Sequence, residues 1–509
     1  MQRICLFIAA LVIIGATGCK KFLDTKPKDF LTPTAYYNTE EQLNNGLTAV
    51  YDILAASELY SNNFTSRMGT EADLGFYARS TFNGPQVYTH TSSDNLVTGT
   101  WQKLYTGISR ANVVLANINR PKMSDSARAR IRGEALFLRA YYYFLLVSNW
   151  GDVPVILEPV TSATGNDVAR TPAKEVYEMI VKDMKEAEGL VNTITAAGFS
   201  GRVTQSAIRG ILARVYLYWA GHPIKDETKY ADAREWALKV MESGLHELDT
   251  SYSQIFINYA QDKYNIRESI WEVEFWGNRL GNAYVETGWI GYTVGIATTD
   301  TEIGFSYGFI NATARLYRLY QEGDVRRDWC IAPFKYSGKN KVAHAANQLY
   351  HRNAGKWRRE YETLNPKAPS TTPQNFPILR YSDVLLMFAE AENHINGPTP
   401  DAYNAINAVR KRAKAPEFEN LGGKEEFFTE LQEERSRELC FEALRKPDLI
   451  RWGKFLETME SAGNEIASEA GTYAYATIAF FNVSAKHLLF PVPARELMLN
   501  RKLTQNTGW

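Results

Sequence analysis

The chain has 509 residues, enough to bury one large core or to form two or three lobes. Its 57 Lys and Arg balance its 57 Asp and Glu, so its overall charge gives no electrostatic basis for binding nucleic acid, and we predict no nucleic-acid partner. Aromatic residues make up 13% of the chain, and its 29 Tyr and 11 Trp suit ring stacking on a ligand as well as core packing.

The N-terminus predicts a secretion signal that ends at a lipid attachment site. An apolar run over residues 4–16 follows a positive residue and is shorter than the roughly 20 residues of a membrane-spanning helix. The sequence ATGC at 16–19 resembles a bacterial lipobox, in which the chain is cut before the cysteine and the cysteine is acylated. We therefore predict a signal peptide over 1–18, lipidation at Cys19 and a tether over 19–37. The alternative is an ordinary signal peptide that is cut near the same point.

Helical periodicity dominates the rest of the chain. Thr171 is the predicted N-cap of the second strong pattern and Gly244 the predicted C-cap of the fourth. The first pattern stops at Trp150-Gly151, where a glycine and a nearby proline end the helix. The predicted helical segments are 130–154, 171–191, 204–221, 229–248 and a pair of helices over 380–414 joined by a Gly-Pro turn.

Paired amphipathic helices with small residues at their contacts predict antiparallel hairpins of the tetratricopeptide type. No clean 34-residue period runs through the chain, because two insertions interrupt it at about 60–100 and 250–377. Their short alternating runs, such as SIWEVEFW at 269–276, predict small strands at most. Cys330 and Cys440 are expected to be unpaired core thiols, with a disulfide as the alternative.

Several segments in chain order carry a family resemblance. They are CKKFLDTKP (19–27), RAYYYFLLVSNWGDVP (139–154), ARVYLYWAG (213–221), YADAREWALKVMESG (230–244), GDVRRD (323–328), ILRYSDVLLMFAEAEN (378–393), INAVRKRA (406–413), ERSRELCFEALRKPDLIRWGKF (434–455) and LLFPVPARELMLNRKLTQNTGW (488–509). As a set they resemble the SusD/RagB family of nutrient-binding outer-membrane lipoproteins of Bacteroidetes.

The resemblance implies a mainly α fold. It would be a superhelix of four tetratricopeptide-like helix hairpins, packed against a large irregular second region that contains short strands. The SusD-like fold would span 38–509. Its repeat helices would lie mainly in 38–60, 101–250 and 378–460, and the variable ligand-binding insertions at about 60–100 and 250–377.

The resemblance also implies a role. The protein would be a non-catalytic lipoprotein on the outside of the outer membrane that captures a glycan and delivers it to a SusC-like, TonB-dependent transporter. Three alternatives remain open at this point: the same lid role with peptide cargo, a scaffold that binds only proteins, and a lipid-anchored hydrolase.

Motifs for catalysis or metal binding are weak in this sequence. GFSYG at 304–308 fits the nucleophile pattern G-x-S-x-G with Ser306 as nucleophile, but the preceding stretch is too polar for the buried strand that an α/β-hydrolase needs. Glu433 and Arg437 stand at i,i+4 and predict a structural ion pair. Since no metal or nucleotide motif is present, we predict no enzyme activity and no cofactor, and leave open only a Ca²⁺ ion held by loop carbonyls.

Aromatic residues in the two insertions are the best candidates for ligand contact. A Trp or Tyr ring can cover the apolar C–H face of a sugar, while nearby Arg, Asn and Asp bond its hydroxyls. Such rings must lie on loops to reach solvent, whereas Tyr142, Tyr216 and Trp236 on the repeat helices are predicted to be core. The candidate ligand residues are Asp73, Phe76, Tyr77, Arg79, Trp276, Asn278, Arg279, Tyr284, Trp289 and Tyr292.

Overall fold

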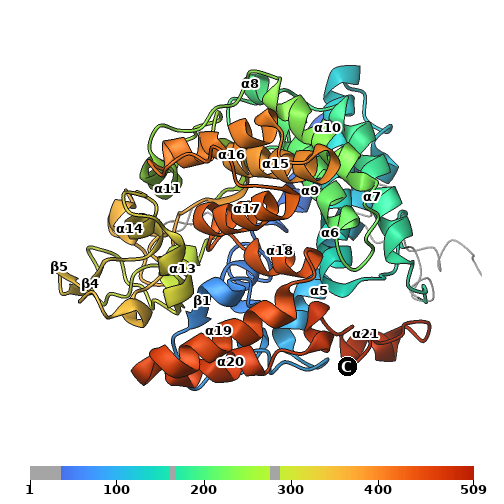
Figure 1. The fold of residues 1–509 in the computed structure, drawn as a ribbon. Coiled ribbons are helices and arrows are strands. Elements are labelled where there is room, and N and C mark those ends of the chain that lie inside the picture. Colours follow the sequence, from blue (N-terminus) through green and yellow to red (C-terminus); the bar gives the residue numbers. More distant parts are fainter. Residues whose placement is uncertain (1–35, 161–166, 276–286) are drawn as a thin grey trace, which may run out of the picture.

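A computed structural model describes residues 36–160, 167–275 and 287–509 (Figure 1). The predicted signal peptide, Cys19 and nearly all of the tether lie outside the described residues. Within the described part of the chain, no helix is both long enough and apolar enough to cross a membrane. The fold is mainly α with three small two-stranded sheets, as predicted.

Eight of the described helices pack against one another in chain order as four consecutive pairs (Figure 1). Each helix contacts the next, including across the jump from α10 to α15, which brings segments far apart in the sequence side by side. This confirms the predicted helix-hairpin architecture. The pairs are α4 (Glu40–Tyr51) with α5 (Asn95–Asn117), α6 (Asp125–Trp150) with α7 (Ala173–Glu188), α9 (Gln205–Ala220) with α10 (Lys229–Met241), and α15 (Tyr381–Asn396) with α16 (Pro400–Arg412).

The helix boundaries follow local signals closely, with two corrections. α6 ends at Trp150, and Gly151 takes a left-handed φ of +72°, as the sequence predicts. Thr171 is not the N-cap of α7. The N-cap is the next residue, Pro172, and the helix begins at Ala173. The Asp152 carboxylate accepts the Ala173 N–H at 2.8 Å. Gly244 is not the C-cap of α10 either: the helix ends at Met241 with Glu242 as C-cap, and Gly244 lies just beyond it with a positive φ of +67°.

The core of the hairpins is aromatic and densely packed. Tyr142, Tyr216 and Trp236 are all buried, which confirms their assignment to the core, and Trp101 is buried with them. Gly107 on α5 allows the close approach of α6, because a Cβ there would lie 2.6 Å from the Tyr142 ring. Buried tyrosines also bond to the backbone: the Tyr142 hydroxyl donates to the Val50 carbonyl at 2.6 Å.

The strands connect the two insertions to each other and to the hairpins. β1, from the first insertion, pairs antiparallel with β3 from the second, with Tyr77 opposite Ile310. β2 pairs with β6 at the entry to α15, and β4 pairs with β5 in an exposed hairpin. The strands are β1 (Gly75–Tyr77), β2 (Ser269–Val273), β3 (Ile310–Ala312), β4 (Phe334–Ser337), β5 (Asn340–Ala343) and β6 (Phe376–Arg380).

The remaining helices are short or C-terminal. α17 lies between the repeat helices and the C-terminal helices α18 and α19, in the middle of the molecule as drawn in Figure 1. These helices are α8 (Ile194–Ala197), α11 (Tyr252–Ala260), α12 (Ile290–Thr293), α13 (Ala314–Leu319), α14 (Arg327–Cys330), α17 (Lys424–Leu439), α18 (Arg445–Arg451), α19 (Phe455–Glu469), α20 (Thr477–Phe481) and α21 (Ala494–Leu499).

A fully buried ion network surrounds α17. Arg326 contacts Glu434 at 2.5 Å and Glu438 at 3.1 Å, while Arg380 contacts Glu438 at 2.9 Å and Glu442 at 2.8 Å. Burial alone would raise the pKa of Glu434, but the nearby guanidinium groups lower it to about 2. The carboxylates of this segment are therefore paired with arginines, as predicted for its sequence.

The smaller predictions for this region are confirmed as well. Arg437 pairs with Glu433 at 3.3 Å across one helical turn. Cys330 and Cys440 are buried free thiols, and each contacts a tyrosine hydroxyl, that of Tyr252 and Tyr320 respectively.

Candidate ligand-binding site

Pairing of β1 with β3 brings aromatic rings from both insertions into one continuous band. The backbone N–H of Ala78 donates to the Phe309 carbonyl at 2.7 Å, so the chain after β1 runs beside the chain before β3. We call the resulting set the aromatic band. It consists of Tyr77, Phe82, Trp289, Tyr292, Phe305, Tyr307 and Phe309.

The rings of the band form a chain of direct contacts. Tyr77 stacks on Phe309 with ring centroids 5.1 Å apart, and Phe309 stacks on Tyr307 at 4.6 Å with planes only 7° apart. Tyr307 meets Tyr292 edge-on at 5.0 Å, and Tyr292 meets Trp289 edge-on at 6.3 Å. These spacings are typical of favourable aromatic pairs, so the rings hold one another in place.

Most rings of the band face solvent on one side. Tyr307 is 38% exposed, and Trp289, Tyr292 and Phe309 are half-buried. Tyr77, at one end, is buried. The band thus combines fixed ring positions with an accessible aromatic surface, the two properties that stacking on a ligand needs.

Direct ring contacts show that the aromatic side chains of the second insertion lie on one side of the chain. The Tyr307 ring lies 5.0 Å from that of Phe305 and 4.6 Å from that of Phe309, measured between ring centroids. The N–H of Tyr307 donates to the Tyr292 carbonyl at 2.9 Å, and that of Phe309 to the Thr293 carbonyl at 2.8 Å, which ties this segment to α12. The glycines at 304 and 308 adopt positive φ, +101° and +56°, at the bends on either side of Tyr307.

Burial removes Ser306 from consideration as a nucleophile. Its side chain points inward and is 3% exposed, and its Oγ donates to the Tyr292 carbonyl at 3.4 Å. A nucleophile elbow needs a serine exposed between a buried strand and a helix. Here the chain continues into β3 instead. The GFSYG sequence therefore builds the aromatic band and no nucleophile elbow.

Two arginines border the band. Arg79 lies over the Phe309 ring at 5.2 Å, and its Nη2 donates to the Tyr307 carbonyl at 2.7 Å. Arg67 lies over Tyr77 and Phe82 at 5.9 and 5.7 Å from the ring centroids. Guanidinium groups stack on aromatic faces and keep donors available for hydroxyl or carbonyl oxygens.

The hydroxyls of Tyr77 and Tyr292 stay neutral at physiological pH. Burial, followed by the hydrogen bond with Tyr307, raises the pKa of Tyr292 to about 12. Burial also raises the pKa of Tyr77 to about 12. The buried Tyr77 hydroxyl has no hydrogen-bond partner among the described residues. The half-buried Tyr292 can therefore donate to a polar ligand over the whole physiological range.

The structure places the predicted ligand residues in three groups. Trp289, Tyr292, Tyr77 and Arg79 meet in or beside the band, although they come from both insertions. Phe76 points to the opposite side of β1 and packs in the core against Tyr350 and Tyr473. The predicted residues that lie outside the described residues are Trp276, Asn278, Arg279 and Tyr284.

Asp73 was wrongly predicted as a ligand residue. Its side chain is 0% exposed, and Arg445 donates to both carboxylate oxygens, at 2.7 and 2.9 Å. That bidentate pair joins the first insertion to α18 and leaves no accessible oxygen for a ligand. Asp73 and Phe76 therefore stabilise the fold beneath the band.

Sequence reasoning missed Phe82, Phe305, Tyr307 and Phe309. A usable signal was present, since three aromatic residues alternate in FSYGF and thereby predict a shared face for an extended chain. The G-x-S-x-G pattern drew attention to the serine between them. Across the described residues, no group of three or more metal-ligating side chains comes together.

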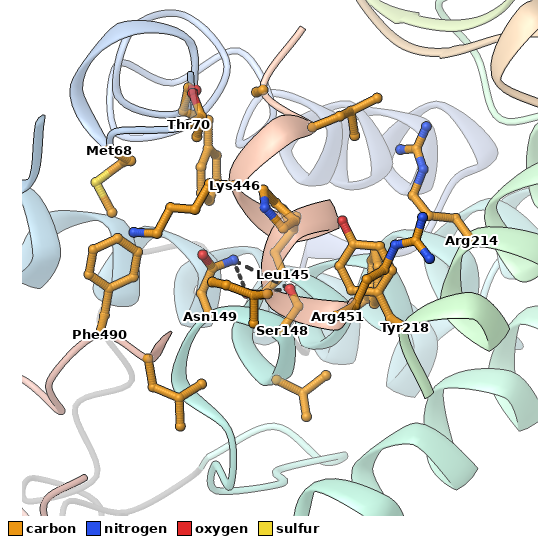
Figure 2. Close-up of a pocket in the computed structure, with 18 of the residues that line it drawn as sticks. Met68, Thr70, Leu145, Ser148, Asn149, Arg214, Tyr218, Lys446, Arg451 and Phe490 are labelled. Carbon is orange, nitrogen blue, oxygen red and sulfur yellow. Dashed lines mark hydrogen bonds between the residues drawn. The ribbon is translucent and has the colours of Figure 1, made fainter. Parts of the chain in front are cut away.

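An internal cavity of about 100 Å³ lies elsewhere in the fold (Figure 2). It shares no lining residue with the aromatic band. Its walls come from α6, α7, α9, α18, β6 and the segment before α21, and Lys446, Arg451 and Arg214 are the cations among them.

Comparison with known proteins assigns the family. A model described as "SusD family" matches residues 332–509, and one described as "Starch-binding associating with outer membrane" matches residues 21–217. The chain belongs to the SusD/RagB family. The two matches cover both ends of the hairpin stack, and the second insertion with the aromatic band lies largely between them.

SusD relatives match the chain over nearly its whole length. The SusD-like protein P25 of Formosa agariphila is 25% identical, with 99% of this chain and 98% of that protein aligned. A crystal structure of a SusD homologue from Bacteroides thetaiotaomicron has a TM-score of 0.85 at 27% identity and covers 94% of this chain and 98% of its own. A laminarin-binding SusD-like protein has a TM-score of 0.74 at 26% identity and covers 93% and 100%.

Proposed function

We propose that this protein is a non-catalytic, lipid-anchored protein of the cell surface that binds an oligosaccharide and delivers it to a SusC-like, TonB-dependent outer-membrane transporter. The observation that carries the proposal is the solvent-facing aromatic band. The SusD/RagB membership supports the same role, because one matching family is described as starch-binding and one similar structure as laminarin-binding.

The band has the chemistry that a sugar requires. A pyranose ring presents an apolar face of C–H groups, which an aromatic plane covers at little cost in side-chain entropy. Tyr307 and Trp289 supply exposed rings separated by Tyr292, so more than one sugar unit can stack along the band. Arg79 and the neutral tyrosine hydroxyls then bond hydroxyl groups at the ring edges.

The other elements of the proposal rest on sequence. Cys19 would carry the lipid, and residues 20–37 would form a tether of up to roughly 60 Å at about 3.3 Å per residue. Trp276, Asn278, Arg279 and Tyr284 directly precede Trp289 in the chain and remain proposed ligand residues on that basis.

Affinity electrophoresis tests glycan binding directly. The chain over 20–509, which contains every described residue, is run through gels that hold laminarin, starch or no polysaccharide. We expect retardation by at least one glycan, and loss of retardation in Trp289→Ala and Tyr307→Ala. Tyr264→Ala is the matched control, because Tyr264 is 39% exposed against 38% for Tyr307 but lies outside the band.

The remaining alternatives give different results in the same preparation. Retardation by no glycan from a broad panel, together with binding of oligopeptides, would show peptide cargo. Release of new reducing ends from a bound glycan would show a hydrolase. Co-purification with proteins alone, unaffected by Tyr307→Ala, would show a scaffold. Recovery of the acylated chain with a large outer-membrane barrel would support delivery to a transporter.

A further inference from the structure

The internal cavity extends from the surface to the interior of the hairpin stack. Its lining includes the exposed His222 and Pro223 and the half-buried Ser148 and Asn149. It also includes the buried ring of Phe376. Figure 2 shows Lys446, Met68 and Phe490 on the left of the cavity and Arg214, Tyr218 and Arg451 on the right. Most of the wall is aromatic or aliphatic, so a molecule inside it needs an apolar body.

The cations of the lining differ in how they are neutralised. Arg451 bonds both oxygens of Glu390 and one of Asp448, and Arg214 bonds Asp383. Each of these guanidinium groups thus has a carboxylate in direct contact. Their charge is compensated before any ligand enters.

Lys446 is the exception. Its side chain is 6% exposed, and its Nζ makes no hydrogen bond or ion pair with any residue in the described part of the chain. Three aromatic rings surround the ammonium group instead, with centroids at 4.5 Å for Phe490, 5.0 Å for Tyr88 and 5.7 Å for Phe455. A buried ammonium without a carboxylate in direct contact is costly, because cation–π contacts replace only part of its hydration.

Polar groups beside Lys446 can complete an anion site. The Asn149 amide donates through Nδ2 to the Leu145 carbonyl at 2.9 Å. The Ser148 hydroxyl donates to the same carbonyl over a long 3.4 Å and accepts from the Asn149 Nδ2 at 3.3 Å. Tyr218 lines the opposite side. These hydroxyl groups can donate to a bound oxygen, whereas the apolar walls offer nothing to a fully hydrated inorganic ion.

We infer that this cavity binds a small organic anion, a carboxylate with an apolar body, with the carboxylate paired to the Lys446 ammonium. The ligand would bring an anion into direct contact with Lys446 and place its apolar part against the aromatic walls. This site is separate from the aromatic band, and the inference does not rest on glycan binding.

Titration of Lys446 gives the site a characteristic pH dependence. Burial lowers the pKa of Lys446 to about 7, with Glu71 acting in the opposite direction. The other ionisable groups that face it are Tyr88, His90 and His487. The histidines stay neutral near pH 7, because burial and then the Lys446 charge lower the pKa of His90 to about 2 and that of His487 to about 4.

The sign of that dependence follows from linkage. Bound carboxylate favours the charged lysine, so above pH 7 binding must take up a proton and the affinity falls by about tenfold per pH unit. Glu71 acts in the same direction, since burial raises its pKa to about 7 and its ionisation at higher pH competes with the ligand. Hexanoate, as a probe, remains ionised throughout this range.

Calorimetric titration of residues 20–509 with hexanoate tests the inference. We expect saturable binding at pH 6.5, at least tenfold weaker at pH 8.5, and little binding of 1-hexanol or inorganic phosphate. Lys446→Met keeps the apolar stem without the charge and is expected to weaken hexanoate binding at least tenfold. Lys182→Met, at an exposed position of α7, is the matched control and should bind like the parent chain.

A second variant keeps the test decisive if Lys446→Met does not fold. Ser148→Trp fills the mouth of the cavity from a half-buried position and is expected to abolish hexanoate binding. The inference is overturned if folded parent protein shows no saturable hexanoate binding. It is also overturned if hexanol binds as tightly as hexanoate, or if neither Lys446→Met nor Ser148→Trp reduces the affinity. Glycan retardation by the aromatic band is unaffected by any of these outcomes.

Discussion

The ion network around α17 and the aromatic band of the insertions are held together by opposite means. In the network, fully buried Arg326 and Arg380 are surrounded by Glu434, Glu438 and Glu442. In the band, neutral rings contact one another and leave one side to solvent. The first arrangement tolerates no missing partner, because each buried charge depends on its neighbours. The second can lose one ring at a modest cost in stability, because its neutral side chains do not depend on a single partner.

The largest expected effect is the loss of stability when the ion network is broken. Glu438→Ala leaves Arg326, Arg380 and Arg412 with fewer buried partners, and we expect the free energy of unfolding to fall by about 3–5 kcal/mol. Urea unfolding followed by circular dichroism measures it. Glu433→Ala is the control, because this carboxylate is largely solvated in its pair with Arg437, and its loss should cost less than about 1 kcal/mol. Equal effects of the two changes would contradict the comparison.

Acid should weaken the network before it affects the rings. Arginines lower the pKa of Glu434 and of Asp383 to about 2, against about 4 in an unfolded chain. Since the folded-state pKa is depressed, this stabilisation is complete above about pH 5 and is lost as the pH falls toward 2. Thermal unfolding from pH 7 to pH 3 should show a steadily lower midpoint. A midpoint that does not change below pH 5 would show that these carboxylates are not paired in solution.

Removal of one partly exposed ring should weaken glycan binding but change the stability of the fold only slightly. We expect Trp289→Ala or Tyr307→Ala to weaken binding of the glycan identified in the gels by roughly tenfold or more, equivalent to about 1.4 kcal/mol. The free energy of unfolding should change by less than about 1 kcal/mol, because both side chains are partly exposed. Calorimetry and urea unfolding on the same samples give the two numbers. A large loss of stability with unchanged glycan affinity would make the band a packing element.

A smaller effect is expected at Arg79. Arg79→Lys keeps the charge but loses the planar stack on Phe309 and one donor to the Tyr307 carbonyl. We expect glycan affinity to fall by about threefold to tenfold, less than for loss of a ring. If Arg79→Lys weakens binding more than Trp289→Ala does, the guanidinium group and not the rings carries recognition.

The smallest effect should come from mild alkali. Because the pKa values of Tyr77 and Tyr292 are raised to about 12, their hydroxyls stay protonated between pH 6 and pH 9. Glycan affinity should therefore be constant within about twofold over this range. A clear decline toward pH 9 would show that another group in the site titrates.

Much of the hairpin stack could be predicted from the sequence. Periodic apolar residues and strong local stops, such as Trp150-Gly151, depend on neighbours in the chain and so identify helices directly. Prediction was weaker at the α7 start, where Asp152, from a distant loop position, replaces Thr171 as the cap. The end of α10 also differs from the prediction, because the helix stops at Met241, before the glycine that was expected to cap it.

Prediction of the site was only partly successful, for a different physical reason. Trp289, Tyr292, Tyr77 and Arg79 could be proposed because loop aromatics beside polar residues suit sugar stacking. Asp73 is likewise a polar residue beside loop aromatics, but it is buried in a pair with Arg445, 372 residues away. Whether a loop side chain faces solvent depends on which distant segment packs over it, and no local pattern carries that information.

The sequence by itself determined the helix hairpins, the resemblance to the SusD/RagB family and the interpretation of the α17 carboxylates as ion-paired groups. Each of these depends on periodicity, spacing or ordered motifs within short segments. Only the tertiary structure decided which rings form the aromatic band and that Lys446 faces a cavity without a partner. Both follow from contacts between segments far apart in the chain, such as β1 with β3 and α18 with Phe490, which are set by the packing of the whole fold.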